Sequence, residues 1–306
     1  MAGSYYVPEK SAFPIFTAFG MWLFVFGLGT LFNDIKAEKP TTTATVLAIL
    51  GFLTIITVLT KWFAAVISEN HAGLASHQLN HSYALGMKWF IFSEVMFFAA
   101  FFGALFYVRN FAVPWLGGEG AKGVAHQFLH QGFQAAWPVM SNPDNATFVA
   151  PHESMAAEGG IFGFKWINAD YLPFINTILL VSSSFTVHIA HLALKKNNRG
   201  QLIAWLAVTV ILGFTFVGLQ AKEYHEAYTA MGLTLKSGIY GTTFFMLTGF
   251  HGFHVTLGAT MLTIMLFRAM KGHFKPESHF GFEAASWYWH FVDVVWIFLF
   301  IFVYLF

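Results

Sequence analysis

The chain has 306 residues, of which 57% are hydrophobic and only 10% are charged, whereas a soluble domain carries about 25% charged residues. This composition excludes an ordinary soluble protein and indicates a membrane protein, and the net charge of +1 argues against nucleic acid as a partner. The chain contains no cysteine, which excludes disulfides, zinc–thiolate sites, iron–sulfur clusters and covalently attached c-type haem.

Seven apolar segments are each long enough to cross a bilayer as a helix that closes its own backbone hydrogen bonds. In chain order they cover residues 14–32, 42–67, 84–109, 172–194, 202–221, 238–267 and 282–306. The first ten residues, MAGSYYVPEK, have no basic segment followed by an apolar one, so we expect no cleaved signal peptide. We therefore predict an all-α, polytopic membrane protein with seven transmembrane helices.

The positive charges of the connections predict the orientation of these helices. With a cytoplasmic N-terminus, nine Lys and Arg residues lie inside and seven outside, and the short KKNNR turn at 195–199 is the best single support. We predict a cytoplasmic N-terminus and a C-terminus on the opposite side of the membrane.

One connection, residues 110–170, is long and rich in Pro and Gly. About sixty residues without strong periodicity indicate either a folded extramembrane flap, which could serve as a docking surface, or a mobile loop. The sequence leaves both interpretations open.

The third segment carries a single acid, Glu94, about ten residues from its start. A helical rise of ~1.5 Å per residue places Glu94 roughly 15 Å deep, near the bilayer midplane. A bare carboxylate is costly there, so Glu94 should be protonated, hydrogen-bonded or in contact with a wet pathway. Two roles follow: a structural hydrogen bond to a neighbouring helix, or a part in proton, ion or lipid contact. Ser93 points about 100° away on the same helix and is a poor partner.

The last segment carries a second intramembrane acid, Asp293, three residues after His290. This spacing puts both side chains on one helix face, so they could pair with each other. We expect Asp293 to make a structural hydrogen bond within its helix or to a neighbouring one.

Several of the 14 histidines form pairs spaced by three or four residues, which suits a metal. A membrane di-iron oxygenase is disfavoured because its histidine boxes would lie at different membrane depths here, and the HxxHH form is absent. A haem held between His191 and His254 is an alternative that no further pattern supports. Hydrogen bonds between helices are the simplest role, and we predict no metal site. The pairs are His77/His81, His126/His130, His188/His191 and His251/His254.

Four stretches together resemble cytochrome c oxidase subunit III in their order and spacing. The predicted number of seven helices also agrees with that family. They are FIFSEVMFF (90–98), LQAKEYHEA (219–227), GIYGTTFFMLTGFHGFHVTLG (238–258) and HFGFEAASWYWHFVDVVWIFL (279–299). The resemblance implies a two-helix bundle, residues 1–83, and a five-helix bundle, residues 84–306, separated by a cleft that holds phospholipid. It implies that haem and copper belong to partner subunits and that this chain has no cofactor of its own.

The resemblance also implies partners and residue roles. Subunit I is the direct partner, with subunit II and small accessory subunits nearby. Glu94 matches a buried glutamate that faces subunit I near a proposed oxygen access route. Other matching positions pack the five-helix bundle: His191, His251, His254, Glu283, His290 and Asp293.

Two departures from the family pattern are visible. Ser68 stands where an arginine of a lipid-phosphate clamp is expected, while Glu69 is kept. His71, Lys61 or Lys88 could replace that arginine in binding lipid. The long insertion at 113–165 favours a bacterial protein of the inner membrane, with the insertion on the periplasmic side.

The function expected from the resemblance is that of an accessory subunit of a haem–copper respiratory oxidase. It would stabilise subunit I, bind phospholipid and support proton uptake and oxygen access, with no catalytic residue of its own. The alternative is an independent proton-coupled transporter that uses Glu94 and Asp293 as relays.

Overall fold

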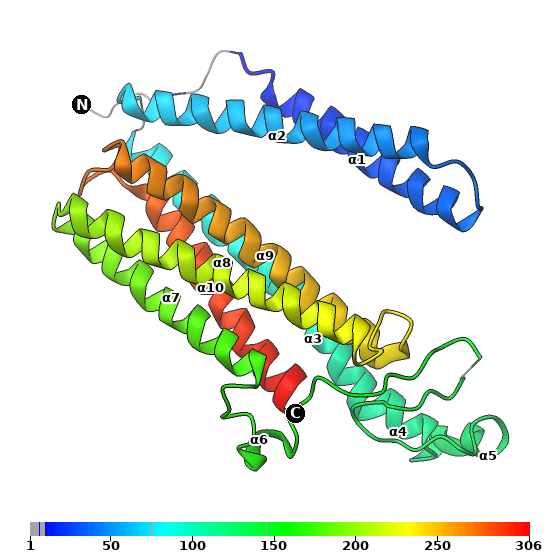
Figure 1. Cartoon of the computed structure of the whole chain (residues 1–306). Coiled ribbons are helices and arrows are strands. Elements are labelled where there is room, and N and C mark those ends of the chain that lie inside the picture. Colours follow the sequence, from blue (N-terminus) through cyan, green and yellow to red (C-terminus); the bar gives the residue numbers. More distant parts are fainter. Residues whose placement is uncertain (1–5, 7–9, 75, 145) are drawn as a thin grey trace. The chain divides into compact units, whose positions relative to one another are not determined.

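The computed structural model describes residues 6, 10–74, 76–144 and 146–306, and the described chain is all-α (Figure 1). The seven expected transmembrane helices are confirmed, because seven helices among the described residues are long and apolar enough to cross a membrane. The chain folds as two compact units, Met1–Leu85 and Gly86–Phe306. The expected lipid cleft between two bundles stays a prediction.

The first unit is built around an antiparallel pair, α1 (Phe13–Lys36) and α2 (Thr42–His71). Pro14 lies in the first turn of α1. Backbone N–H groups there have no acceptor within the helix, so proline, which lacks this group, costs no hydrogen bond. Glycines bring the two backbones together, since a Cβ on Gly27 would collide with the backbone of Ala48. Small residues at the contact are the usual basis of helix packing in membranes.

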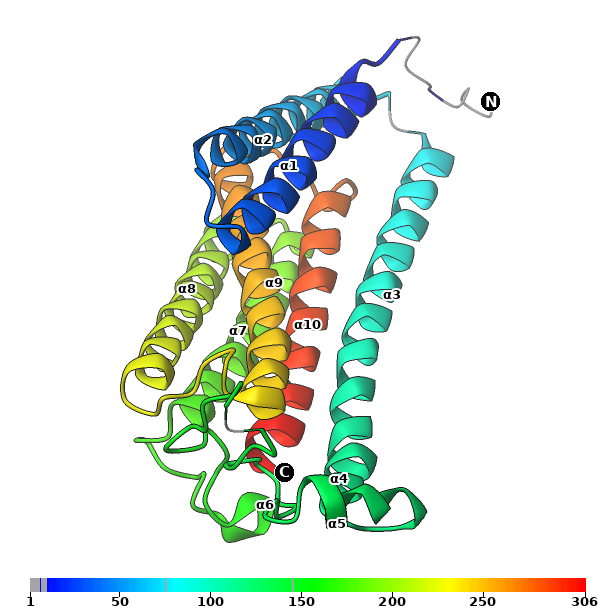
Figure 2. The same cartoon turned by 90° about the vertical axis from the view of Figure 1, so that its right-hand side faces the viewer.

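The second unit contains the other five long helices (Figure 2). They are α3 (His77–Tyr107), whose first residues belong to the first unit, α7 (Leu172–Lys195), α8 (Arg199–Thr229), α9 (Gly238–Met270) and α10 (Phe280–Leu299). A short π-helix, η3 (Phe300–Leu305), continues α10. Within this unit α10 is central, since 67% of its apolar stretch is buried, against 11% for α3.

Buried tryptophans fix α10 against α7. The indole N–H of Trp289 donates to the Ser183 hydroxyl over 2.9 Å, and that of Trp296 donates to the Thr177 hydroxyl over 2.9 Å. Each large ring therefore buries its apolar surface while its one polar atom keeps a partner.

The long connection contains several short helices and packs partly on the rest of the second unit, to which it belongs. The helices are η1 (Val108–Ala112), α4 (Val113–Leu116), η2 (Ala121–Ala125), α5 (His126–Leu129) and α6 (Gly160–Gly163). The backbone N–H of His152 donates to the Met231 carbonyl over 2.8 Å, and that of Ala157 to the Tyr304 carbonyl over 2.7 Å. This second half of the connection is thus a folded flap held by backbone hydrogen bonds.

Most helices are longer than the sequence predicts. The third begins at His77 rather than 84, and the fifth ends at Thr229 rather than 221. The reason is that hydropathy marks only the apolar part of a helix, whereas backbone hydrogen bonding continues through the polar residues beyond it.

Candidate functional site at the buried acid of α3

Glu94 lies on α3 opposite His254 of α9, within the second unit. Glu94 Oε2 is 2.9 Å from His254 Nε2, and both side chains are largely buried. The structure thus places the predicted acid beside one of the predicted histidines. Ser93 instead donates to the carbonyl of Phe90 on its own helix, as its direction requires.

Aromatic rings align the two helices around this pair. Phe97 and Phe98 lie one turn after Glu94, so they share its side of α3. The Phe98 ring contacts the His254 ring edge-on at 5.1 Å between centroids, and the Phe97 ring contacts Phe250 at 5.0 Å. Phe250 precedes His254 by one turn, so the same two helix faces carry the rings and the polar pair.

The hydrogen bonds of His254 determine how many protons the pair holds. Nδ1 lies 2.6 Å from the Phe250 carbonyl oxygen, which can only accept, so Nδ1 carries a hydrogen. Nε2 and Glu94 Oε2 then share one further proton between them. Whether this proton lies on the carboxyl or on the ring, the net charge of the pair is zero. This is the charge that a membrane interior tolerates best.

An apolar groove of about 750 Å³ lies between α3 and α10, and its lining begins one residue after Glu94 in the chain. Val95 lines the groove at this end, and Arg109 and Asn110 line it farther along. The Arg109 guanidinium donates to the carbonyl of Phe306 and lies over the Trp137 ring. The remaining lining is mostly aromatic, including Phe98, Phe102, Phe106, Phe291, Phe298 and Phe302. The groove can hold a small apolar molecule or an acyl chain.

Two of the other predicted residues, one on α9 and one on α10, contact neighbouring helices. Nε2 of the fully buried His251 donates to the Val292 carbonyl over 3.1 Å. Asp293 is buried and lies beside Ser184 of α7. Among the described residues no hydrogen bond joins Asp293 to His290, so of the two arrangements that the sequence allows, the contact is with a neighbouring helix. Asp293 and His290 both lie toward α7, where Asp293 is beside Ser184 and His290 is near His188.

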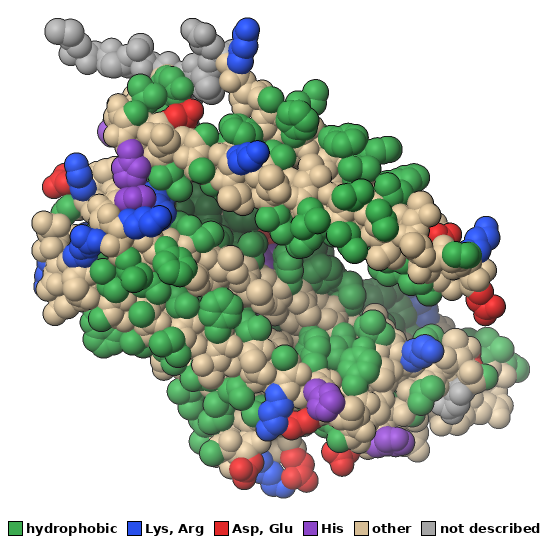
Figure 3. All heavy atoms as spheres, turned by 45° about the horizontal axis from the view of Figure 1, so that its top comes forward, with side chains coloured by type: hydrophobic (Ala, Val, Ile, Leu, Met, Phe, Trp, Pro, Cys, Tyr) green, Lys and Arg blue, Asp and Glu red, His purple; other side chains and the backbone are tan. Residues whose placement is uncertain are grey.

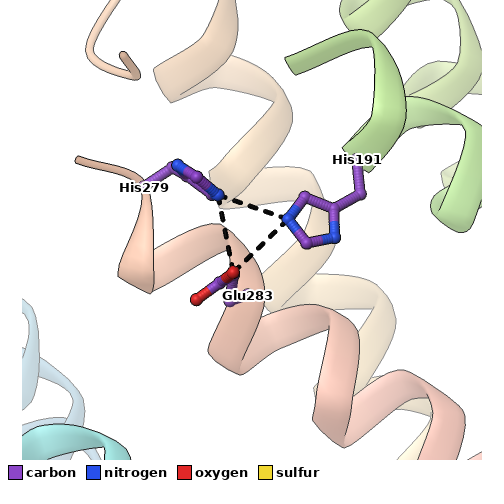
Figure 4. A group of neighbouring side chains, drawn as sticks. All are labelled: His191, His279 and Glu283. Atoms are coloured by element: carbon purple, nitrogen blue, oxygen red, sulfur yellow. Dashed lines mark hydrogen bonds and ion pairs between the residues drawn. The ribbon is translucent and has the colours of Figure 1, made fainter. Parts of the chain in front are cut away.

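His191 and Glu283, two of the predicted packing residues, come together where α7 ends and α10 begins (Figure 4). His279 joins them, 3.3 Å from His191 between Nε2 atoms. The structure therefore does not pair His191 with His254, as a bridging haem would require.

The predicted lipid-binding residues are divided between the two units. Lys61, Glu69 and His71 are on α2 in the first unit, and Glu69 lies 3.5 Å from the Tyr6 hydroxyl. Lys88 is on α3 in the second unit, with its ammonium group 5.9 Å from the centre of the Trp287 ring. The lipid-phosphate clamp stays a prediction.

Sequence reasoning missed a third buried acid, Glu223 on α8. It is 1% exposed, and Tyr304 donates a 2.6 Å hydrogen bond to its Oε1. The predicted fifth segment ends at 221, which left Glu223 in a connection. Its helical spacing from Gln220 and Ala227, both buried, is the signal that could have found it.

A tyrosine outside the membrane-spanning segments links this region to the flap. The Tyr171 hydroxyl donates to the Met155 carbonyl over 3.0 Å. Burial, aided by the nearby Glu223 charge, raises the pKa of Tyr171 well above its usual range. The hydroxyl therefore stays protonated and keeps its role as a donor.

Comparison with known proteins places the chain in a family. The family model described as "Cytochrome c oxidase subunit III" matches residues 3–120 and 145–306. Proteins named cytochrome c oxidase subunit 3 from Struthio camelus and Dugong dugon are each 36% identical, over 304 and 302 residues. The first match covers 99% of this chain and 97% of the relative, and the second covers 98% and 96%. The Homo sapiens protein of that name is 35% identical over 98% of this chain and 96% of its own length. The chain therefore belongs to the cytochrome c oxidase subunit III family.

Proposed function

We propose that the chain is an accessory membrane subunit of a haem–copper terminal oxidase and supports proton uptake and oxygen access by its catalytic subunit. The observation that carries this proposal, beside family membership, is the Glu94–His254 pair at 2.9 Å. It is an ionisable pair at membrane depth, and such groups are typically functional.

The surroundings of the pair support a role in serving a partner's reaction. One proton is shared between Oε2 and Nε2, and its shift from one atom to the other leaves the pair without a net charge. The adjoining groove is mostly apolar and of a size that suits O₂ or an acyl chain.

The proposal includes the setting of the chain. Its relatives are by name subunits of cytochrome c oxidase, so we propose direct contact with subunit I and proximity to subunit II and to small accessory subunits. Haem and copper would reside in these partners and none in this chain. Phospholipid would bind near Lys61, Glu69, His71 and Lys88. We further propose a bacterial inner membrane with a cytoplasmic N-terminus.

Replacing the acid tests the proposal in the assembled oxidase. Glu94→Gln should leave the haem content unchanged, while proton uptake slows or the enzyme loses activity sooner during turnover, because the shared proton is gone. Proton uptake in vesicles and the decay of oxygen consumption measure these effects. Ser93→Ala, one residue away and facing elsewhere, is the matched control and should behave as the parent does.

Two outcomes would contradict the proposal. Complete loss of oxidase activity in an assembled Glu94→Gln complex would show that the residue is not accessory. If proton uptake and the lifetime of activity in that variant equalled those of the parent, Glu94 would have no role in proton delivery.

A second experiment separates the accessory subunit from an independent transporter. An accessory subunit should copurify with a haem-bearing partner, and the haem bands should stay with the partner after this chain is stripped off. Proton movement by the chain alone in liposomes, abolished by Glu94→Gln and by Asp293→Asn, would favour the transporter. Haem held tightly by this chain alone would also contradict the accessory role.

A further inference from the structure

Three side chains with metal-ligating atoms converge at the junction of α7 and α10 (Figure 4). Nε2 of His191 lies 3.3 Å from Nε2 of His279 and 3.5 Å from Oε1 of Glu283. Nε2 of His279 is also 3.5 Å from the same carboxylate oxygen. The three atoms form a nearly equilateral triangle.

The size of this triangle suits a metal ion better than a hydrogen-bonded cluster. Good hydrogen bonds join such atoms at about 2.7–3.2 Å, so all three contacts are long. A point equidistant from atoms at these separations lies about 2.0 Å from each, which matches Zn–N and Zn–O bonds of about 2.0–2.2 Å. The three distances between ligand atoms are also those expected between the ligands of a tetrahedrally coordinated ion with such bonds.

The outer hydrogen bond of one histidine prepares it as a ligand. His279 Nδ1 lies 3.2 Å from the carbonyl oxygen of Lys275, which can only accept, so Nδ1 carries the hydrogen. In the neutral ring Nε2 then presents its lone pair to the other two residues. Ligating histidines typically have such a second hydrogen bond.

The fold holds the three residues in place through regular elements. His279 is the residue before α10, and Glu283 lies one turn later on the same side. His191 is in the last turns of α7 and packs against the fully buried Phe282, with ring centroids 5.6 Å apart. All three side chains are partly exposed, so an ion can reach them and a fourth position is open to water.

We propose that His191, His279 and Glu283 bind one divalent transition-metal ion of the Zn²⁺ class, which ties the end of α7 to the start of α10. Two imidazoles and a carboxylate form a ligand set that zinc uses elsewhere. The proposal differs from the prediction of no metal site, which weighed histidine pairs close in sequence, took His191 and Glu283 as packing residues and did not consider His279.

Positive charges near the three ligands oppose the binding of a cation. Lys195 lies one turn after His191, and Figure 3 shows Lys, Arg and His side chains at the end of the molecule where Figure 1 places the α7–α8 and α9–α10 turns. Such a setting disfavours a loosely bound cation, so binding here depends on direct coordination. Glu283 supplies the one negative charge of the ligand set, and its removal should therefore weaken binding strongly.

Metal titration of the full chain tests the proposal. The purified chain in detergent is first stripped with EDTA, and Zn²⁺ is then added in competition with a chromophoric chelator. We expect one Zn²⁺ per chain, and Co²⁺ in its place should give the strong visible absorption of a tetrahedral site. Glu283→Gln, which keeps the size of the side chain, should lower the Zn²⁺ affinity by about 100-fold or more.

The controls separate coordination from misfolding and from surface binding. His225→Gln, which removes an exposed histidine on α8, should leave the affinity unchanged. Helical circular dichroism should be the same for Glu283→Gln and the parent. His191→Gln is a second variant that must also weaken binding. Absence of stoichiometric Zn²⁺ binding, or equal affinity in Glu283→Gln and the parent, would overturn the proposal and leave a triad that only shares a proton.

Discussion

At the scale of single residues, the second unit satisfies buried polar groups by pairing them across helices. Glu94 of α3 pairs with His254 of α9, and Glu223 of α8 accepts from Tyr304 near the chain's end. Lipid supplies no water to replace a lost partner, so each pair depends on both of its members. Removing one member of a pair therefore costs the free energy of a buried polar group that has no hydrogen-bond partner.

Tyr304→Phe should therefore destabilise the chain by about 1–3 kcal/mol, because Oε1 of Glu223 loses its donor and Oε2 already has no partner among the described residues. The measurement is the thermal midpoint of the detergent-solubilised full chain. Tyr228→Phe, which alters an exposed tyrosine on α8, is the control and should shift the midpoint little. Equal midpoints for Tyr304→Phe and the parent would show that the hydrogen bond contributes nothing.

At the scale of elements, close backbone contact holds α1 to α2. The buried faces of both helices consist of small residues, Gly20 and Gly27 on α1 and Ala44, Ala48 and Gly51 on α2. The large side chains of this unit mostly point outward, where lipid can cover them. The pair thus depends on van der Waals contact at a few positions rather than on a large apolar core.

Gly27→Leu should separate α1 from α2, because no side chain fits between Gly27 and the Ala48 backbone. Overpacking of this kind typically costs about 1–3 kcal/mol. Gly29→Leu is the matched control on the same helix, since an added Cβ there meets nothing within 4 Å. Thermal loss of helical circular dichroism compares the two variants. A Gly27→Leu midpoint no lower than that of Gly29→Leu would contradict the packing described.

At the scale of the whole molecule, patterns local in sequence predicted the helices, whereas the pairing of distant residues needed the structure. Seven apolar runs were enough for the fold class, and depth alone singled out Glu94. Nothing in the sequence shows that residue 254 lies opposite residue 94, or that His279 meets His191 from a different helix. Such contacts arise from the tertiary packing of helix faces, which hydropathy does not encode.

The predicted orientation can be tested on the whole chain, because it has no native cysteine. In intact cells, a single cysteine at Glu119→Cys, in the long connection, should react with an impermeant maleimide. A single cysteine at Lys196→Cys, in the α7–α8 turn, should react only after the membrane is opened. Both positions are exposed, so each serves as the control for the other. The reverse pattern would show that the chain is inserted with its N-terminus outside.

The shared proton of Glu94 and His254 has an electrical consequence. A unit charge that crosses the whole ~30 Å core gains about 2.3 kcal/mol per 100 mV. A proton that moves within the 2.9 Å between Oε2 and Nε2 crosses at most about a tenth of that core, worth at most about 0.2 kcal/mol per 100 mV. The membrane potential therefore hardly affects which atom holds the proton. Local contacts, such as that of the Phe250 carbonyl with Nδ1 of His254, set the position of the proton instead.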